Sequence, residues 1–202
     1  PPKVHIWSIP YEGGEAVSHG KGEHPVISHS GDRIAFVRDK QIWISPIDGS
    51  SDPEKLFTAR GTNGSMQWSP DDSKLAFVSN RDDHSFVGIY SDKSTPIQWV
   101  SPSFHRDIAP KWSRDGDKIA FIRRPGTGGK PKTILVARHQ PWKIMVGDVE
   151  TGKSTEIWSP PMTVAGSVPS TQGRYNMNWG NGHLTFMSYH DGWPHLYSIQ
   201  DG

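Results

Sequence analysis

One short pattern occurs three times along this chain, and it constrains the possible folds more than any other feature. Each copy joins a strand-like start to a turn rich in Ser and Asp, followed by an apolar segment of the form Ile/Leu-Ala-Phe-Val/Ile. The copies cover Ile27–Val37, Trp68–Val78 and Trp112–Ile122, and a shorter fourth copy covers Trp179–Met187. Such self-similarity predicts a fold assembled from repeated units that cannot bury their apolar faces alone.

The period of the pattern selects the architecture. The central residues Phe36, Phe77, Phe121 and Phe186 lie 41, 44 and 65 positions apart, so the last unit carries an insertion. A repeat of about 40 residues built from short strands is typical of a β-propeller, in which each repeat forms one blade. The sequence therefore predicts an all-β fold, a β-propeller of four-stranded antiparallel blades with about four blades' worth of strands.

Turn chemistry and the alternation of apolar residues place the strands within each repeat. In the second repeat they are expected at Ser65–Trp68, Lys74–Ser79, Phe86–Ser91 and Pro96–Val100. Third and fourth strands of the other repeats are expected at Gln41–Ser45, Glu54–Phe57, Lys143–Val146, Thr155–Trp158 and His195–Ile199. The propeller segment is expected to fill residues 1–202, with repeats near 8–50, 51–93, 94–148 and 149–202 and an insertion at 123–142.

The two ends of the chain fall at the same point of the repeat. Val4–Ile9 has the pattern of a third strand and is followed by a fourth strand near Glu15–Val17, while Leu196–Ile199 again has the pattern of a third strand. Two third strands cannot both fill one slot of a closing sheet. We therefore expect an open arc of a larger ring of roughly six to eight blades, with association of copies into a homo-oligomer through the end blades as one outcome.

Composition narrows the classes of partner. The formal net charge is +1, which gives no strong electrostatic attraction to nucleic acid or to a membrane surface. No apolar run approaches the length of a transmembrane helix, so no membrane span is expected. The chain contains no Cys, which excludes disulfides and thiolate chemistry and leaves the compartment open between the cytoplasm, the periplasm and the extracellular space.

The second copy, Trp68-Ser-Pro-Asp-Asp-Ser-Lys-Leu-Ala-Phe-Val78, resembles the propeller repeat of TolB-type proteins and of the prolyl oligopeptidase family of serine peptidases. The segments Thr133–Trp142, Gly147–Gly152 and Asp191–Ser198 look like the propeller of dipeptidyl-peptidase-like and acylaminoacyl-peptidase-like members of that family. The resemblance implies a separate α/β-hydrolase domain that carries the catalytic Ser, Asp and His, with the Ser on a Gly-x-Ser-x-Gly turn. No such string occurs in these residues, so no catalytic residue is expected among them.

The resemblance implies that the propeller caps the active site of the parent peptidase and gates or positions short peptide substrates for the hydrolase domain. An alternative from another class stays open, a TolB-type propeller that binds a protein partner and has no enzymatic activity. A third reading is a propeller lyase or glycosidase with its site in the channel. It is disfavoured because no paired carboxylates can be placed on the expected inner strands.

The insertion at 123–142 holds the candidate binding residues, because insertions in repeat proteins lie in loops on one face that is often functional. Arg123, Arg124, Arg138 and His139 could hold the carboxylate or a terminus of a peptide through bidentate hydrogen bonds. A solvated loop is the alternative interpretation of the same residues.

The Trp residues divide into two groups. Trp68, Trp112 and Trp179 recur at one position of the repeat and are expected in the core. Trp142 and Trp193 lie outside that register, so they are candidates for exposed contacts with a substrate or partner.

Neither a metal nor a cofactor is expected. The cluster Asp82-Asp83-His84 offers too few alternating oxygens for a calcium loop, and the His residues between 183 and 195 lack the tight pairing of a zinc motif. Gly126–Lys130 lacks the first Gly and the final Ser or Thr of a phosphate-binding loop. Asn63-Gly64-Ser65 matches a glycosylation acceptor but is more simply a turn before a strand.

Overall fold

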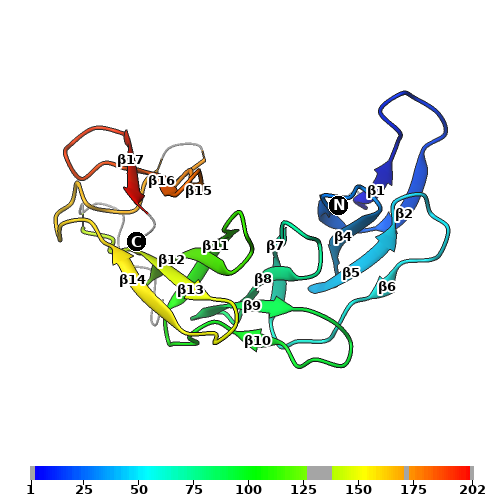
Figure 1. The fold of residues 1–202 in the computed structure, drawn as a ribbon, viewed down its shortest axis with the longest axis horizontal. Helices are drawn as coiled ribbons and strands as arrows, with labels where there is room; N and C mark the ends of the chain where they lie inside the picture. The colour runs from blue at the N-terminus through cyan, green and yellow to red at the C-terminus, as the bar shows by residue number, and fades with distance from the viewer. Residues whose placement is uncertain (1–2, 127–137, 171–172, 201–202) are drawn as a thin grey trace.

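The computed structural model describes residues 3–126, 138–170 and 173–200, and these form only strands, turns and loops. The strands build antiparallel units that follow one another along an open arc (Figure 1), and one parallel pair, Arg106 with Ser85, joins two of these units into a single eight-stranded sheet. We call the first strand pair the N-terminal hairpin and the units after it blades 1 to 4. In each blade the first strand lies toward the concave side of the arc and the last toward the outside (Figure 1).

The elements are as follows. The N-terminal hairpin consists of β1 (His5–Ser8) and β2 (Val17–Lys21), and blade 1 of β3 (Glu23–Ile27), β4 (Arg33–Arg38), β5 (Gln41–Pro46) and β6 (Glu54–Lys55). Blade 2 consists of β7 (Thr62–Trp68), β8 (Leu75–Asn80), β9 (Ser85–Tyr90) and β10 (Gln98–Trp99). Blade 3 consists of β11 (Arg106–Trp112), β12 (Lys118–Arg124), β13 (Lys143–Asp148) and β14 (Ser154–Trp158). Blade 4 consists of β15 (Asn178–Trp179), β16 (His183–Ser188) and β17 (His195–Gln200).

Successive side chains of the repeated apolar motif point alternately toward the blade before and the blade after. In blade 2, Leu75 and Phe77 of β8 pack back onto blade 1, whereas Ala76 packs forward onto blade 3. The small Ala leaves room for the Phe ring of the following blade, so Phe77 shares a cluster with Ala35, and Phe121 shares one with Ala76. The central Phe is fully buried in all four copies, which explains why the motif combines a small and a large residue.

A Trp indole also binds each of blades 2, 3 and 4 to the blade before it. The Trp at the end of the first strand donates from Nε1 to a backbone carbonyl on the first strand of the preceding blade. The distances are 3.3 Å from Trp68 to Val26, 2.9 Å from Trp112 to Gln67 and 2.9 Å from Trp179 to Lys111. Trp68 and Trp112 are buried and Trp179 is partly buried, so the Trp register predicted from the repeat does lie in the core.

Each first strand is also bent at the same position. Three residues before the Trp position, the backbone takes a left-handed conformation at His24, Ser65, Ala109 and Asn176, with φ between 43° and 54°. In β3, β7 and β11 this residue coincides with a break in the ladder register, which marks a β-bulge. The bulges lie on the strands that form the concave side of the arc, where they re-aim side chains and discourage pairing with a foreign strand.

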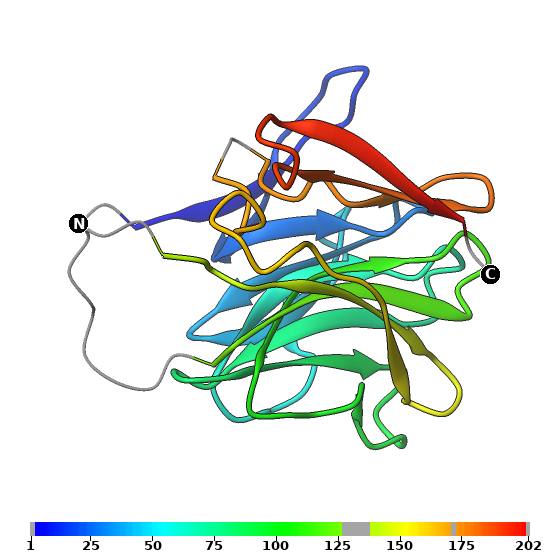
Figure 2. The ribbon, with the colours of Figure 1, turned by 90° about the vertical axis from the view of Figure 1, so that its left-hand side faces the viewer.

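The N-terminal hairpin is held against blade 1 by both apolar and polar contacts. Ile6 packs with Ile34 and Phe36, and the buried His19 ring lies within hydrogen-bonding distance of Ser8 (2.8 Å) and Ser45 (3.2 Å). Burial lowers the pKa of His19, which favours the neutral ring in this site. In Figure 2 the long axes of the strands are broadly aligned from one sheet to the next.

The predicted all-β propeller of antiparallel blades is confirmed, with four strands in each of blades 1 to 3 and three in blade 4 among the described residues, and the observed strands match the expected ones closely. The repeat boundaries placed near residues 50, 93 and 148 fall just before the last strand of a blade. The last strands of blades 1 and 2 are only two residues long, so they leave little periodic signal in the sequence. The number of blades in a closed ring stays a prediction.

Candidate functional site

One cavity gathers most of the predicted binding residues, and we call it the blade 3 pocket. Its volume is about 290 Å³, and it lies where β12 ends and β13 begins. Arg123, Arg124, His139 and Trp142 all line it. The structure therefore brings together four of the six residues that the sequence singled out.

Arg123 forms a buried ion pair and does not lie in an open loop. Its Nε and Nη2 atoms donate to the two carboxylate oxygens of Asp107 on β11, each at 2.7 Å, and Nη2 also donates to the carbonyl of Ser101 at 2.7 Å. Burial raises the pKa of Asp107, and the bidentate contact with Arg123 opposes that rise. Arg123 thus fixes the end of β12, and it belongs to the strand rather than to the insertion.

A second ion pair, between Lys143 and Glu156, also lines the pocket. Lys143 donates from Nζ to Glu156 at 2.9 Å, and the Ser159 hydroxyl donates to the other Glu156 oxygen at 2.8 Å. These bonds hold the pKa of Glu156 below its usual range, with Lys143 as the largest cause. The Glu156 carboxylate is therefore ionised and already bonded at neutral pH.

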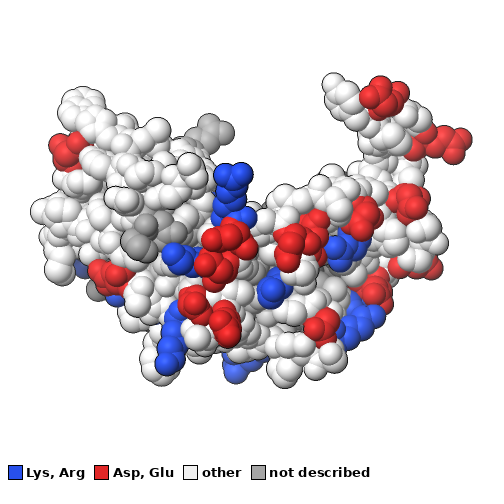
Figure 3. Space-filling model, in the orientation of Figure 1, with Lys and Arg blue, Asp and Glu red and all other residues white. Residues whose placement is uncertain are grey.

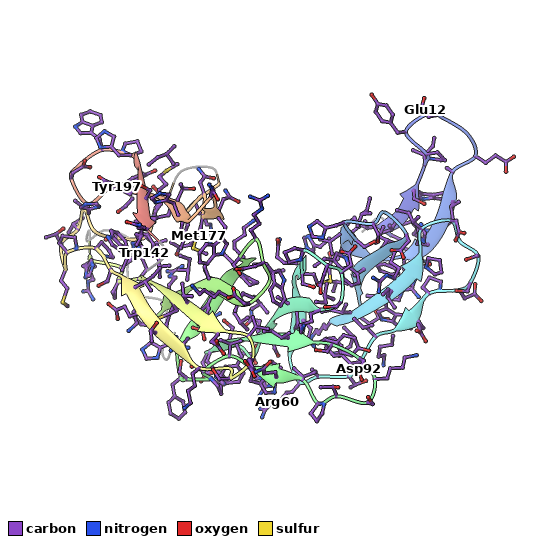
Figure 4. The ribbon with its side chains drawn as sticks, viewed as in Figure 1. Glu12, Arg60, Asp92, Trp142, Met177 and Tyr197 are labelled. Carbon is purple, nitrogen blue, oxygen red and sulfur yellow. The ribbon has the colours of Figure 1, made fainter. Side chains whose placement is uncertain are left out.

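Trp142 lies in the core, which corrects the expectation that it is exposed. Only 3% of its surface is accessible, and its ring packs against Trp158, Tyr175 and Phe186 with centroids 4.9–6.2 Å apart. Figure 4 shows Trp142 at the same end of the arc as Met177 and Tyr197, which belong to the same cluster. The insertion adds an aromatic anchor to the contact between blades 3 and 4, so it lies outside the repeat register and is still buried.

Two buried nitrogen atoms of the pocket residues have no hydrogen-bond partner among the described residues. They are Nε1 of Trp142 and Nε2 of His139. Buried polar groups in native structures are nearly always paired, so an unpaired one next to a cavity calls for an explanation. Both atoms are closed to solvent, so an acceptor from outside reaches either of them only if the lining side chains shift.

Arg124 is the third permanent cation of the pocket. It is the last residue of β12 and is partly buried. Burial raises the pKa of the nearby Tyr175 hydroxyl, while the charges of Arg124 and Arg174 oppose the rise. Both carboxylates of this region, Asp107 and Glu156, are bonded to Arg123 and Lys143, so the positive charge of Arg124 is not balanced by them.

The two remaining candidates lie elsewhere. Arg138 is exposed and is not part of the pocket lining. Trp193 is 71% exposed in the turn between β16 and β17, as the sequence suggested, and it too is outside the pocket. Most of the insertion, residues 127–137, lies outside the described residues.

Sequence reasoning missed four residues that shape this site, namely His105, Asp107, Lys143 and Glu156. One signal for Asp107 was present, because it occupies the same place in β11 that Asn63 occupies in β7, five residues before the Trp. Both side chains are fully buried. Asn63 also donates to backbone carbonyls in the fold, so it reads as a structural residue rather than as an accessible glycosylation acceptor.

A second polar cluster of the described residues lies away from the blade 3 pocket. The Ser8–His19–Ser45 cluster is buried at the junction of the N-terminal hairpin and blade 1 and contains no carboxylate. Over residues 3–126, 138–170 and 173–200, there is no group of three or more His, Asp or Glu placed to hold a metal ion. None of the described segments forms a helix of the length and apolarity that a membrane crossing needs.

Charged side chains of both signs lie on the face of the molecule shown in Figure 3. Figure 3 shows acidic and basic side chains interspersed over the middle of the arc, while the end formed by blade 4 is mostly uncharged in this view. In the blade 3 pocket, three permanent cations meet one carboxylate among the described lining residues.

The fold and the pocket together define a β-propeller segment with a small basic pocket on one blade. Among solved structures, the chain is similar to Porphyromonas gingivalis dipeptidyl peptidase 4, with 18% identity and a TM-score of 0.67 over 92% of this chain and 32% of that one. It is also similar to TolB from Acinetobacter baumannii, with 15% identity and a TM-score of 0.57 over 99% of this chain and 50% of that one.

A third similar structure is an oligogalacturonate lyase from Vibrio parahaemolyticus, with 16% identity and a TM-score of 0.65 over 97% of this chain and 54% of that one. The chain thus spans only about a third to a half of these solved chains. No protein-family model and no curated protein matches the sequence. The similarity establishes the propeller fold, and one fold serves several functions, so function must be argued from the site.

Proposed function

We propose that this chain is the non-catalytic propeller part of a serine peptidase of the prolyl oligopeptidase family. In this proposal it admits short peptides and positions them for an α/β-hydrolase domain of the same parent protein. The dipeptidyl peptidase 4 similarity over 92% of the chain supports the proposal, as do the repeat and the segments at 147–152 and 191–198.

The observation that carries the proposal is the composition of the blade 3 pocket. A peptide-positioning surface needs a few fixed polar groups beside an apolar wall. The pocket offers a rigid wall, held by the Arg123–Asp107 pair, and an aromatic floor at Trp142, together with the cation Arg124.

Three experiments test this function. The purified chain should bind peptides of three to five residues, and a fluorophosphonate probe should label none of its Ser residues, because it lacks a nucleophile on a Gly-x-Ser-x-Gly turn. Stoichiometric labelling of a Ser would contradict the non-catalytic role. The gene should encode such a turn after this segment, followed by Asp and His, and a gene without them would contradict the peptidase assignment.

A second candidate is a TolB-type module that binds a folded protein. The observation that favours it is a set of fully or largely exposed apolar side chains. They are Tyr11, Phe104, Met162 and Trp193. In this case short peptides would not bind, the gene would encode no hydrolase domain, and changing these side chains to Ser would abolish binding of the partner without changing the fold.

A further inference from the structure

We propose that the blade 3 pocket recognises the free α-carboxylate at the C-terminus of a peptide. This inference rests on the proposed peptide-positioning function and specifies which end of the peptide the pocket takes. It follows from the charges of the pocket, from its unpaired indole donor, and from its size and apolar rim.

The charge balance favours an anion. Three permanent cations line the pocket, and Glu156, the only carboxylate among the described lining residues, is bonded to Lys143. Asp107, behind the wall, is bonded to both donor arms of Arg123. A carboxylate entering the pocket therefore meets the charge of Arg124, and guanidinium groups bind carboxylates with favourable two-bond geometry.

The same charge balance disfavours the other end of a peptide. An α-ammonium group needs an available carboxylate, and Glu156 already accepts hydrogen bonds from Lys143 and Ser159. To bind an amine, the pocket would have to break the Lys143–Glu156 pair. The unpaired Lys143 and the incoming ammonium group would then both lie beside the Arg124 cation. A free N-terminus is therefore a poorer ligand than a free C-terminus.

The unpaired indole N–H of Trp142 gives the second argument for a carboxylate ligand. Trp142 is 97% buried, as its 3% exposure shows, and its Nε1–H has no acceptor within the described residues. An indole nitrogen can only donate, so the group that satisfies it must be an acceptor. A carboxylate has enough lone pairs to accept from both Arg124 and Trp142, whereas an amide oxygen lacks the charge that strengthens the bond to Arg124. Because Nε1 of Trp142 is closed to solvent in the structure, the proposal requires the lining side chains to shift when the carboxylate binds.

The dimensions and rim fit the end of a chain. A volume of about 290 Å³ is at the lower limit for ligand pockets, so it suits one or two residues rather than a long segment. The exposed apolar lining residues, which form its rim, are Pro125, Pro141 and Met162, and Met162 is 87% exposed. We therefore expect a terminal residue with an apolar side chain, whose carboxylate reaches the cation and whose side chain covers the rim.

The experiment compares three peptides by isothermal titration calorimetry with the full 202-residue chain. They are N-acetyl-Ala-Ala-Leu with a free carboxylate, the same peptide as its C-terminal amide, and Ala-Ala-Leu amide with a free amino group. The free acid should bind at least about tenfold more tightly than either amide, since a hydrogen-bonded charge contributes on this scale. Binding of the acid should also shift the indole N–H resonance that Trp142→Phe removes from the NMR spectrum.

Three variants locate the effect. Arg124→Gln should remove most of the preference for the acid, and Trp142→Phe, which keeps an aromatic ring in the core, should weaken acid binding about three- to tenfold. Arg114→Gln is the matched control, because it removes the same charge from an exposed turn of the same blade outside the pocket, and it should bind like the unchanged chain. Circular dichroism melting curves check that each variant is folded.

The outcomes distinguish failure of the carboxylate inference from failure of the peptide-positioning function. Equal binding of acid and amides, tighter binding of the free amine, or an unchanged preference in folded Arg124→Gln would overturn the carboxylate inference and leave the peptide-positioning function standing. If none of the three peptides binds the folded chain, both the inference and the peptide-positioning function fail.

Discussion

The carboxylate of Asp72 in blade 2 accepts a hydrogen bond from the backbone N–H of His29 in blade 1, at 2.8 Å. Its second oxygen accepts from the N–H of Ser30 at 2.7 Å. Asp72 has a left-handed backbone with φ of 57°, and the matching positions of the other two long copies are Gly31 and Gly116 with φ of 74° and 77°. The second copy therefore has an Asp with a strained backbone where Gly would be unstrained. The hydrogen bonds that Asp72 accepts from blade 1 offset this strain.

Asp72→Ala should lower the free energy of unfolding by about 2–3 kcal/mol, because it leaves two backbone N–H groups without acceptors and keeps a side chain in the left-handed region. Asp72→Gly should cost less, since Gly relieves the backbone strain. Urea unfolding of the two variants shows which has the lower free energy of unfolding. If Asp72→Gly were as damaging as Asp72→Ala, the strain would not contribute.

The same contact predicts a loss of stability in acid. Burial acts to raise the pKa of Asp72, but the N–H groups of Ser30 and His29 outweigh it and hold the pKa well below the usual range. Because the native pKa is depressed, the stabilisation is complete above the unfolded value of about 3.9 and is lost as the pH falls through the native pKa. The stability difference between the unchanged chain and Asp72→Asn should therefore be constant near neutral pH and shrink below about pH 4. A difference that stays constant down to about pH 2 would contradict this.

The fold was predictable to a large extent because its signal is local and repeated. The pattern of β8, Leu-Ala-Phe-Val, alternates between two apolar faces, and its Phe recurs at intervals close to one blade. The inner-strand bulges were not predicted, because His24, Ser65 and Ala109 are ordinary residues whose left-handed backbone depends on the neighbouring strand. Local residue types do not encode that pairing.

The site was predictable only in part, for a related reason. The sequence identified Arg123, Arg124, His139 and Trp142 because they crowd into one insertion. It could not show that Arg123 is paired with Asp107, since that carboxylate lies on another strand, 16 residues away. Trp142 was expected at the surface because it breaks the Trp register, whereas its ring fills the space between blades 3 and 4.

Phe77→Ala and Phe121→Ala should each lower the free energy of unfolding by about 3–5 kcal/mol, because both rings are fully buried between two blades and their loss leaves a cavity. Lys74→Ala, just before β8 in the same repeat, should cost less than about 0.5 kcal/mol. Thermal melting of the three variants checks the prediction. Equal melting temperatures for Phe77→Ala and Lys74→Ala would break the assignment of the motif to the blade core.

Gly88→Ala should destabilise the chain by about 1–3 kcal/mol through overpacking. Gly88 lies opposite Phe77 in the β8–β9 ladder, and an added Cβ would come within 2.6 Å of the Phe77 ring. Gly64→Ala is the matched control in β7, where the added Cβ meets its nearest neighbour, Val37, at an ordinary 3.5 Å. A Gly88→Ala variant as stable as Gly64→Ala would mean that the Phe77 ring can move aside, and the core would then be looser than its burial indicates.

The buried pair behind the pocket gives the last prediction. Arg123 and Asp107 are 10% and 0% exposed at their side chains, so removing either partner leaves the other as a buried, uncompensated charge. Asp107→Ala and Arg123→Ala should each cost about 3–5 kcal/mol, whereas Asp107→Leu combined with Arg123→Met should cost much less than the two single changes together, because two apolar groups need no partner. Urea unfolding of the four proteins gives the coupling energy. Additive single and double effects would show that the two side chains act independently, and Arg123 would then be free to serve the pocket as a ligand-binding cation instead of a structural one.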